Sequence, residues 1–288
     1  MIDRYLLRYF LAVVDHGAFT KAAASVHVAQ PTLSVGIAKL ERLVGAPLFH
    51  RSNQRVSLTE AGAKFAAHAR RIEREFALAE SAFSRAGPRR TLRLGVLHTV
   101  AAHELEDLAA RLKGVDDAER LEMVEGSERD LAHKLAQGRI DLALSLVRED
   151  QRFVGEPLRE EPYTLAVASS HPAADEAVVT GESLAGEVMI VRRNCEALSQ
   201  TSRYFTERGV RPFFCLKTTQ DERAMALVRA GTGITVIPQR HAGPGVACPR
   251  LAGFDLTRTL GLLYGPEAEA LAASSSPVME ALRAVFAA

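Results

Sequence analysis

The chain has 288 residues, of which 47% are hydrophobic and 25% charged, a balance typical of a soluble protein of about two domains. No apolar run approaches the ~20 residues of a membrane-spanning helix, and the N-terminus shows no small-residue cleavage site, which argues against an integral membrane or secreted protein and predicts a cytoplasmic one. The net charge of +1 hides an asymmetry: residues 1–90 hold 14 Lys and Arg against 7 Asp and Glu, and the remainder holds 22 against 28, which favours a basic nucleic-acid-binding module on an acidic body over a chance split.

The first segments predict short helices. Gly17 ends the first helix, and residues 22–26 form a second with little side-chain bulk, so that another helix can approach closely. Pro31 suits the first turn of a third helix, and Gly45 is placed to cap its end. The first helix is indicated by four apolar residues with i, i+3, i+4, i+7 spacing: Leu7, Phe10, Leu11 and Val14.

The third helix, over residues 30–43, has the pattern of a helix that reads DNA. Its buried stripe leaves its N-terminal half free to present polar side chains to base edges in a major groove. Glutamine pairs best with adenine, and threonine and serine serve either base type. An ordinary surface helix is the alternative. The residues expected at the DNA interface are Gln30, Pro31, Thr32, Ser34, Val35 and Lys39.

Residues 48–58 alternate around a Ser-Asn-Gln tip, which predicts a two-stranded hairpin. Arg51 and Arg55 flank the tip. Beside a groove-reading helix, such a wing would contact phosphates or the minor groove, and arginine suits both.

Thr59 and Glu60 then start a long helix that runs to about Phe83. Apolar residues recur along it at heptad spacing, which favours pairing with the same helix of a second subunit; packing on its own domain is the alternative. Gly87 and Pro88 end the helix and begin a linker. The residues expected to mediate dimerisation are Phe65, Ile72, Phe76 and Phe83.

The run from Phe10 to Phe65, FLAVVDHGAFTKAAASVHVAQPTLSVGIAKLERLVGAPLFHRSNQRVSLTEAG and the residues that follow it, resembles the LysR-type transcriptional regulators. The resemblance implies a winged helix-turn-helix and a dimerising linker helix, in a bacterial dimer or tetramer that binds promoter DNA and responds to a small effector. The family's wing arginine corresponds to Arg51. Its groove-facing residues correspond to Gln30, Pro31, Thr32 and Ser34.

Two positions depart from the family pattern. Residue 29 is usually Ser or Thr, whereas Ala29 has no capping hydroxyl. The family often has Arg-Gln after the recognition serine, whereas this chain has Val35 and Gly36. That change removes two hydrogen-bonding side chains and places a helix-weakening glycine in the reading helix. Base specificity therefore cannot be carried over, and Val35 suits a thymine methyl group instead.

Beyond residue 90, strands and helices alternate, which favours a parallel sheet covered by helices. A helical stretch is expected after the first strand, and further helices at 127–137, 199–208 and 221–230. The strands are expected at 91–97, 121–125, 140–146, 163–169, 188–191, 213–218 and 234–237.

Three motifs in this part, LRLGVLHT, VEGSERDLAHKLAQGRIDLALSL and TTQDERAMALVRAGTGITVIP, resemble the effector domain of the same regulators, which is similar to periplasmic binding proteins. The resemblance implies two lobes with a hinge of two crossing strands near Glu161 and Leu262. The expected fold is thus α/β, with a winged helix-turn-helix and long linker helix before a two-lobed, periplasmic-binding-protein-like effector domain. Its expected units are 1–60 for DNA binding, 61–90 for dimerisation and hinge, and 91–288 for effector binding, with lobe 1 at 91–160 and 266–288 and lobe 2 at 161–265.

Ligands of such sheets bind at the carboxyl ends of strands, beside helix N-termini that favour anions. We therefore expect a small effector between the lobes, and an anion would suit the site. Helix capping is the alternative role for each residue placed there. Those residues are Thr99 and Ser127 from lobe 1, and Asn194, Cys195, Glu196 and Thr219 from lobe 2.

Cys195 follows two arginines and precedes a predicted helix, a setting that can lower the pKa of a thiol. Some regulators of the family sense peroxide through a disulfide, but the spacing of Cys195 and Cys215 does not match theirs. A redox switch at Cys195 is the alternative to a structural or ligand-facing thiol. The odd number of cysteines and the lack of CxxC, HExxH and GxSxG motifs predict no disulfide framework, metal site, cofactor or catalytic site.

The sequence thus predicts a sequence-specific transcriptional regulator in which effector binding closes the lobes and changes how paired subunits bend DNA. Its rival is a cytoplasmic solute-binding module whose N-terminal part serves only dimerisation. Changing Gln30 and Arg51 to alanine separates the two, because only the regulator would lose DNA binding while its ligand affinity stays intact.

Overall fold

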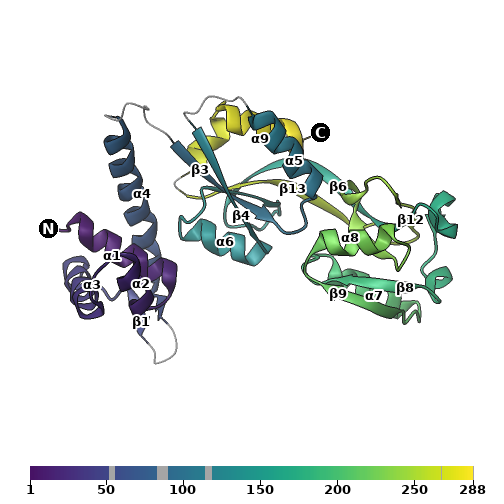
Figure 1. Cartoon of the computed structure of the whole chain (residues 1–288), viewed down its shortest axis with the longest axis horizontal. Coiled ribbons are helices and arrows are strands. Elements are labelled where there is room, and N and C mark those ends of the chain that lie inside the picture. The colour runs from purple at the N-terminus through teal and green to yellow at the C-terminus, as the bar shows by residue number, and fades with distance from the viewer. Residues whose placement is uncertain (52–55, 83–89, 114–118, 267, 288) are drawn as a thin grey trace.

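The computed structural model describes residues 1–51, 56–82, 90–113, 119–266 and 268–287. Figure 1 shows an N-terminal helical module, a long helix that leaves it, and an α/β body whose lobe 1 lies beside the long helix and whose lobe 2 lies at the far end. Within the described ranges, no helix combines the length and the apolar character needed to cross a membrane.

The N-terminal module packs short helices and a hairpin around one apolar cluster. Gly17 and Gly45 end the first and third helices with φ angles of 64° and 76°, the left-handed conformation that glycine adopts most readily. Leu6, Phe10 and Leu33 are fully buried between the helices, so the amphipathic pattern decides the packing. The elements are α1 (Arg4–His16), α2 (Phe19–Ser25), α3 (Gln30–Val44), and the antiparallel strands β1 (Phe49–Arg51) and β2 (Val56–Leu58).

The long helix α4 (Glu60–Ala82) begins where the sequence predicts. Thr59 Oγ1 accepts a hydrogen bond from the backbone N–H of Gly62 at 2.9 Å, which caps the helix.

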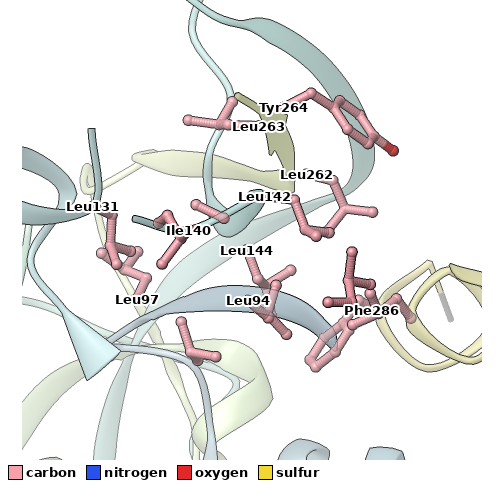
Figure 2. Packing of buried hydrophobic residues seen from close by; sticks show 14 of the residues in the cluster. Leu94, Leu97, Leu131, Ile140, Leu142, Leu144, Leu262, Leu263, Tyr264 and Phe286 are labelled. Carbon is pink, nitrogen blue, oxygen red and sulfur yellow. The ribbon is translucent and has the colours of Figure 1, made fainter. Parts of the chain in front are cut away.

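Lobe 1 is built on parallel strands with helices on both faces. β3 lies between β4 and β5, α6 covers one face, and α5 and α9 pack together on the other (Figure 1). Figure 2 shows Leu94, Leu144, Leu262 and Phe286 meeting in the core between the sheet and α9. The elements are β3 (Arg90–Leu97), α5 (Ala102–Leu112), β4 (Glu119–Gly126), α6 (Glu128–Ala136), β5 (Leu142–Leu146) and α9 (Pro277–Phe286).

Lobe 2 places α7 and α8 around the parallel pair β8 and β9. Short 3-10 helices occupy connections at Pro172–Asp175, Glu182–Leu184, Gln239–His241 and, in lobe 1, Glu269–Ala273. The remaining elements are β7 (Val178–Val179), β8 (Val188–Arg192), α7 (Leu198–Glu207), β9 (Phe213–Thr218), α8 (Asp221–Arg229), β10 (Thr235–Pro238), β11 (Val246–Ala247) and β12 (Arg250–Leu251).

Two long strands connect the lobes and correct the sequence-based description. β6 (Val154–Ala168) begins nine residues before the strand expected at 163–169, and it pairs antiparallel with β13 (Thr257–Tyr264). The sheet, in the order β10-β6-β13-β5-β3-β4, is therefore mixed and not purely parallel. Glu161 lies opposite Arg258 at the crossing, as expected for the hinge, but Leu262 lies deeper in lobe 1, between Glu156 and Leu144.

Candidate functional site

The outer face of α3 carries the side chains predicted to read DNA. Gln30, Pro31 and Thr32 are exposed at its start, and Ser34 accepts a hydrogen bond from Gln30 Nε2 at 3.0 Å. Val35 is 68% exposed in the N-terminal half of α3, whereas Leu33, Ile37 and Leu40 of the same helix are buried. The start of α3 thus presents a polar, uncharged surface with one apolar patch, a combination that can contact base edges and thymine methyl groups.

Gly36 corrects one sequence-based interpretation. The glycine is buried, and a Cβ atom built on it would lie 2.7 Å from Cδ2 of Tyr9 on α1. It is a position of close approach between two helices, and not a gap in the reading surface. The hydrogen-bonding side chain that the family often has here could not extend from this backbone without displacing Tyr9.

Lys39 and the wing arginines are also predicted to contact DNA, and the structure shows less of them. Lys39 donates a hydrogen bond to Tyr5 OH at 2.8 Å, so its ammonium group is held against its own module. In the wing, β1 and β2 pair along their length. Arg51 ends β1, but its side chain and all of Arg55 lie outside what the structure describes.

The predicted seam of α4 divides into an inner and an outer part. In the inner part, Phe65 packs edge-on against Phe10 with ring centroids 5.1 Å apart, and Ala69 is fully buried in the same module. These first turns therefore pack on their own domain, which was the alternative weighed for the seam.

The outer part of the seam faces solvent. Ile72 and Phe76 are 39% and 41% exposed, and the guanidinium of Arg4 lies 4.4 Å from the centre of the Phe76 ring. They leave an apolar face on α4 that a second subunit can cover. Phe83, the last residue of the predicted seam, lies outside the described residues.

Arginines from α4 and lobe 1 join the DNA-binding module to the body. Arg70 on α4 donates through Nε to the carbonyl of Gln137 at 3.0 Å and through Nη2 to Asp15 at 2.5 Å. Arg139 in lobe 1 donates to the carbonyl of Val14, and its Nε lies 3.3 Å from Asp15. The end of α1 is therefore held by one arginine from the long helix and another from lobe 1.

The carboxylate of Glu196, whose side chain is 10% exposed, bonds to groups on both sides of the cleft between the lobes. Thr99 of lobe 1 donates through Oγ1 to Glu196 Oε2 of lobe 2 at 2.9 Å. Arg258 Nη1 donates to Glu196 Oε1 at 2.6 Å, and its Nη2 donates to the carbonyl of Thr99 at 2.9 Å. Tyr163 OH donates to Glu196 Oε1 at 2.6 Å. We call Thr99, Tyr163, Glu196 and Arg258 the cleft cluster.

The cleft cluster continues into the hinge strands. Arg258 Nε donates to Glu161 Oε1 at 2.8 Å, and the same oxygen lies 3.5 Å from Arg159 Nη2. Arg159 binds both oxygens of Glu104, at 2.5 and 3.0 Å. The three carboxylates of Glu104, Glu161 and Glu196 thus face the two guanidinium groups of Arg159 and Arg258, and these five side chains carry one net negative charge.

Contacts within the cluster keep Glu196 ionised. Burial alone would raise the pKa of its carboxyl, but the charge of Arg258 and the hydrogen bond from Tyr163 outweigh burial and hold that pKa below its usual value. Burial and the nearby Glu196 charge raise the pKa of Tyr163, so its hydroxyl stays protonated and donates.

A second buried group lies behind the cleft, at the end of β8. Arg192 pairs with Asp221, whose Oδ2 lies 3.5 Å from His241 Nε2. Cys195 Sγ lies 3.6 Å from Arg192 Nη1, yet burial raises the thiol pKa more than the arginine lowers it. The expectation that this setting lowers the thiol pKa is therefore wrong, because burial outweighs the charge of Arg192, and Arg193 is exposed.

The other predicted effector residues have local roles. Ser127 is exposed and caps α6 by accepting from the N–H of Asp130 at 3.2 Å. Asn194 Nδ2 donates to the carbonyl of Thr219, which is itself exposed, at 3.1 Å. Of the six predicted side chains, the structure brings Thr99 and Glu196 into direct contact.

Sequence reasoning missed Tyr163 and Arg258, which hold Glu196 in place, and it placed Glu161 at the hinge without its role as a partner of Arg258. Their signal is the presence of ionisable residues in otherwise strand-like segments, at 159–161 and at 258. Charged residues in a strand that passes through a core need partners there, and such positions point to a buried polar site.

The cleft cluster leaves little free volume. The opening beside Glu196, Tyr163 and Arg258 holds about 190 Å³. A larger hollow of about 860 Å³ lies within lobe 2, between α7 and β9. Its mainly apolar lining includes Phe205 and Phe214 and also reaches Cys195 and Glu196. Typical ligand sites hold roughly 300–1,000 Å³, so the cleft as it stands accepts only a very small molecule.

Comparison with known proteins gives a consistent result along the whole chain. The family described as "Bacterial regulatory helix-turn-helix protein, lysR family" matches residues 5–63, and the family described as "LysR substrate binding domain" matches residues 85–287. The chain is 31% identical over 287 residues to the "DNA-binding transcriptional dual regulator OxyR" of Escherichia coli K12, covering 96% of this chain and 94% of that protein.

Further relatives agree. The chain is 30% identical over 269 residues to the "Hydrogen peroxide-inducible genes activator" of Dickeya chrysanthemi, covering 90% of this chain and 88% of that one. Among solved structures, a cysteine-to-aspartate variant of full-length OxyR from Pseudomonas aeruginosa superposes with a TM-score of 0.67 at 22% identity, covering 98% of this chain and 95% of that one. With a winged helix-turn-helix at its front and a two-lobed effector domain behind it, the chain belongs to the LysR family of DNA-binding transcriptional regulators.

Proposed function

We propose that α3 reads the major groove of promoter DNA through Gln30, Thr32 and Val35, with the β1–β2 wing on the adjacent backbone. The observation that carries this proposal is the exposed, uncharged start of α3, since direct readout needs side chains free to meet base edges. The excess of basic residues in the first 90 supplies the attraction to phosphates.

The test is a gel-shift titration against the DNA upstream of the chain's own gene. Thr32→Ala and Gln30→Ala each weaken binding to the preferred site by ~5–160-fold, because a lost base contact costs roughly 1–3 kcal/mol. Thr206→Ala, at an exposed threonine on α7 in lobe 2, is the matched control and leaves affinity unchanged. Equal binding by all of these proteins would refute the assignment of α3.

We further propose that the effector binds at the cleft cluster. Support comes from Thr99 in lobe 1 and Glu196 and Arg258, which meet across the lobes, because a ligand that touches both lobes couples its own binding to their closure. A panel of small organic acids and amines is screened for a rise in melting temperature, since selective binding to the folded state stabilises it. Thr99→Val should abolish the rise given by a true effector.

We also propose that two subunits pair through Ile72 and Phe76 of α4. The proposed domains are 1–60 for DNA binding, 61–90 for dimerisation and hinge, and 91–288 for effector binding. The protein acts in the cytoplasm, where promoter DNA is, and regulates without catalysing a reaction of its own; its relatives are themselves named as regulators. Changing Ile72 and Phe76 together to serine should convert dimers to monomers in analytical ultracentrifugation.

Thiol oxidation at Cys195 is the second candidate signal, because relatives are named as peroxide-inducible activators and this thiol neighbours Glu196. The geometry supports it less. The side chain is 9% exposed with a raised pKa, and Cys215 lies three residues before the end of β9, about 10 Å along the strand from the level of Arg192, beyond disulfide reach. Mass spectrometry after peroxide treatment decides: we expect no oxygen addition at Cys195, and rapid stoichiometric addition there would favour the redox signal.

A further inference from the structure

We infer that Glu196 is a tethered ligand: its carboxylate occupies the place that the carboxylate of a small organic acid takes when such an effector binds between the lobes. This inference rests on the proposed function for the location of the effector site. It names the chemical class of the effector and what that effector must displace.

The hydrogen bonds around Glu196 are those of a bound carboxylate. One oxygen accepts from Thr99 of lobe 1, and the other accepts from Tyr163 and from Arg258. Arg258 also binds the backbone carbonyl of Thr99, so the donors form one continuous cradle across the cleft. A guanidinium and two hydroxyl groups around one planar anion form a recognition site for carboxylates in general.

The attachment of Glu196 lets its side chain leave that cradle. The residue lies in the turn between the end of β8 at Arg192 and the start of α7 at Leu198. That turn is held by the backbone bonds from Cys195 to Arg192 and from Leu198 to Cys195, neither of which uses the Glu196 side chain. Rotation of one side chain therefore empties the cradle without unwinding a helix or strand.

Charge and volume favour displacement over binding beside Glu196. The side chains of Glu104, Arg159, Glu161, Glu196 and Arg258 already carry one net negative charge, and a second anion among them would raise it to two in a buried site. The opening of about 190 Å³ beside Tyr163 and Arg258 is also small, and the larger hollow in lobe 2 is lined by Glu196 but not by the donors of the cradle. An incoming carboxylate that replaces Glu196 keeps both the charge balance and every hydrogen bond of the cradle.

The test removes the Glu196 side chain and supplies a free carboxylate, formate, in its place. Glu196→Ala in the full-length protein is melted in sodium formate and in sodium chloride of equal ionic strength. In chloride, its melting temperature falls by roughly 5–15 °C, since Arg258 loses a buried partner. In formate a large part of that loss is recovered, while the wild-type protein responds equally to the two salts because its cradle is full.

Two variants control this comparison. Glu196→Gln keeps the cradle filled with an uncharged amide, so its melting temperature falls but formate gives no recovery. Glu207→Ala, at an exposed carboxylate on α7, melts like the wild-type protein in both salts. Calorimetric titration should show formate binding to Glu196→Ala alone.

The inference is overturned if formate stabilises Glu196→Ala no more than chloride does. If this variant does not fold during expression, its recovery from urea into formate or chloride gives the same comparison: better recovery in formate supports the tethered ligand, and equal recovery overturns it. Neither experiment uses DNA, so a failure here leaves gel-shift evidence for the regulator intact, and a failure of DNA binding leaves the formate result standing.

Discussion

The DNA-binding module and the interlobe cleft are held together by opposite kinds of interaction. In the module, Leu6, Phe10 and Leu33 are fully buried apolar side chains, and water is excluded by their packing. In the cleft, Glu196 and Arg258 are buried charges whose stability depends on each having its partner. Removing one member of a buried ion network leaves the others unpaired, so the cleft is the part suited to switching.

The largest effect should come from removing the arginine of the cleft. Arg258→Ala leaves Glu161 and Glu196 buried without their main partner, so the free energy of unfolding should fall by roughly 3–5 kcal/mol in urea titrations. Arg250→Ala, whose pair with Asp255 is exposed, should change it by under about 0.5 kcal/mol. A similar small effect from both would mean that the cleft network does not stabilise the lobes.

A smaller effect is expected where the module packs tightly. Gly36→Gln forces a side chain into the ring of Tyr9, and the free energy of unfolding should fall by roughly 1–3 kcal/mol. Tyr9→Ala in the same chain should remove part of that cost by opening space. If Gly36→Gln instead leaves stability unchanged and tightens DNA binding, the residue belongs to the reading surface after all.

The buried histidine of lobe 2, His241, should make the stability of the protein depend on pH. Burial lowers the pKa of His241 although the Asp221 carboxylate lies 3.5 Å from its Nε2, so the folded state holds the ring neutral. As pH falls below the unfolded pKa of about 6.5, the unfolded chain takes up a proton more readily and stability is lost, by at most ~1.4 kcal/mol per pH unit. Replacing His241 by Asn should remove this contribution in urea titrations between pH 7 and 5.5; an unchanged slope would show that other groups produce it.

The smallest effect on stability is expected at Val35. Its exposed side chain adds nothing to the core, so Val35→Ala should unfold like the wild-type protein. Its affinity for DNA should nevertheless fall by about 4-fold for each methyl group lost from contact with a thymine. An unchanged gel-shift titration would remove Val35 from the interface.

The sequence predicts the DNA-binding module better than the interlobe cleft. The ends of α1 and α3 and the start of α4 follow from the local signals of Gly17, Gly45 and Thr59, each of which acts within one helical turn. The cleft depends on contacts such as Thr99 with Arg258, 159 residues apart, which no periodicity encodes.

Two misjudged positions show the same limit. From the sequence, Gly36 is a helix-weakening residue in the reading helix. The sequence does not show that Tyr9, on another helix, packs against it and leaves no room for a side chain. The sequence shows two arginines before Cys195 but not the burial of its thiol, which raises the thiol pKa more than Arg192 lowers it. Both depend on what lies opposite in space.

The joint formed by Asp15, Arg70 and Arg139 has a mechanical consequence. It grips α4 at Arg70, about 15 Å from the start of that helix, and reaches the end of α1 directly from lobe 1. A rotation of lobe 1 therefore acts directly on α1, against which α3 packs. It need not be transmitted along the polypeptide that follows α4. If the effector signal passes through these arginine contacts, inserting several residues between α4 and β3 should leave the response of DNA binding to the effector intact.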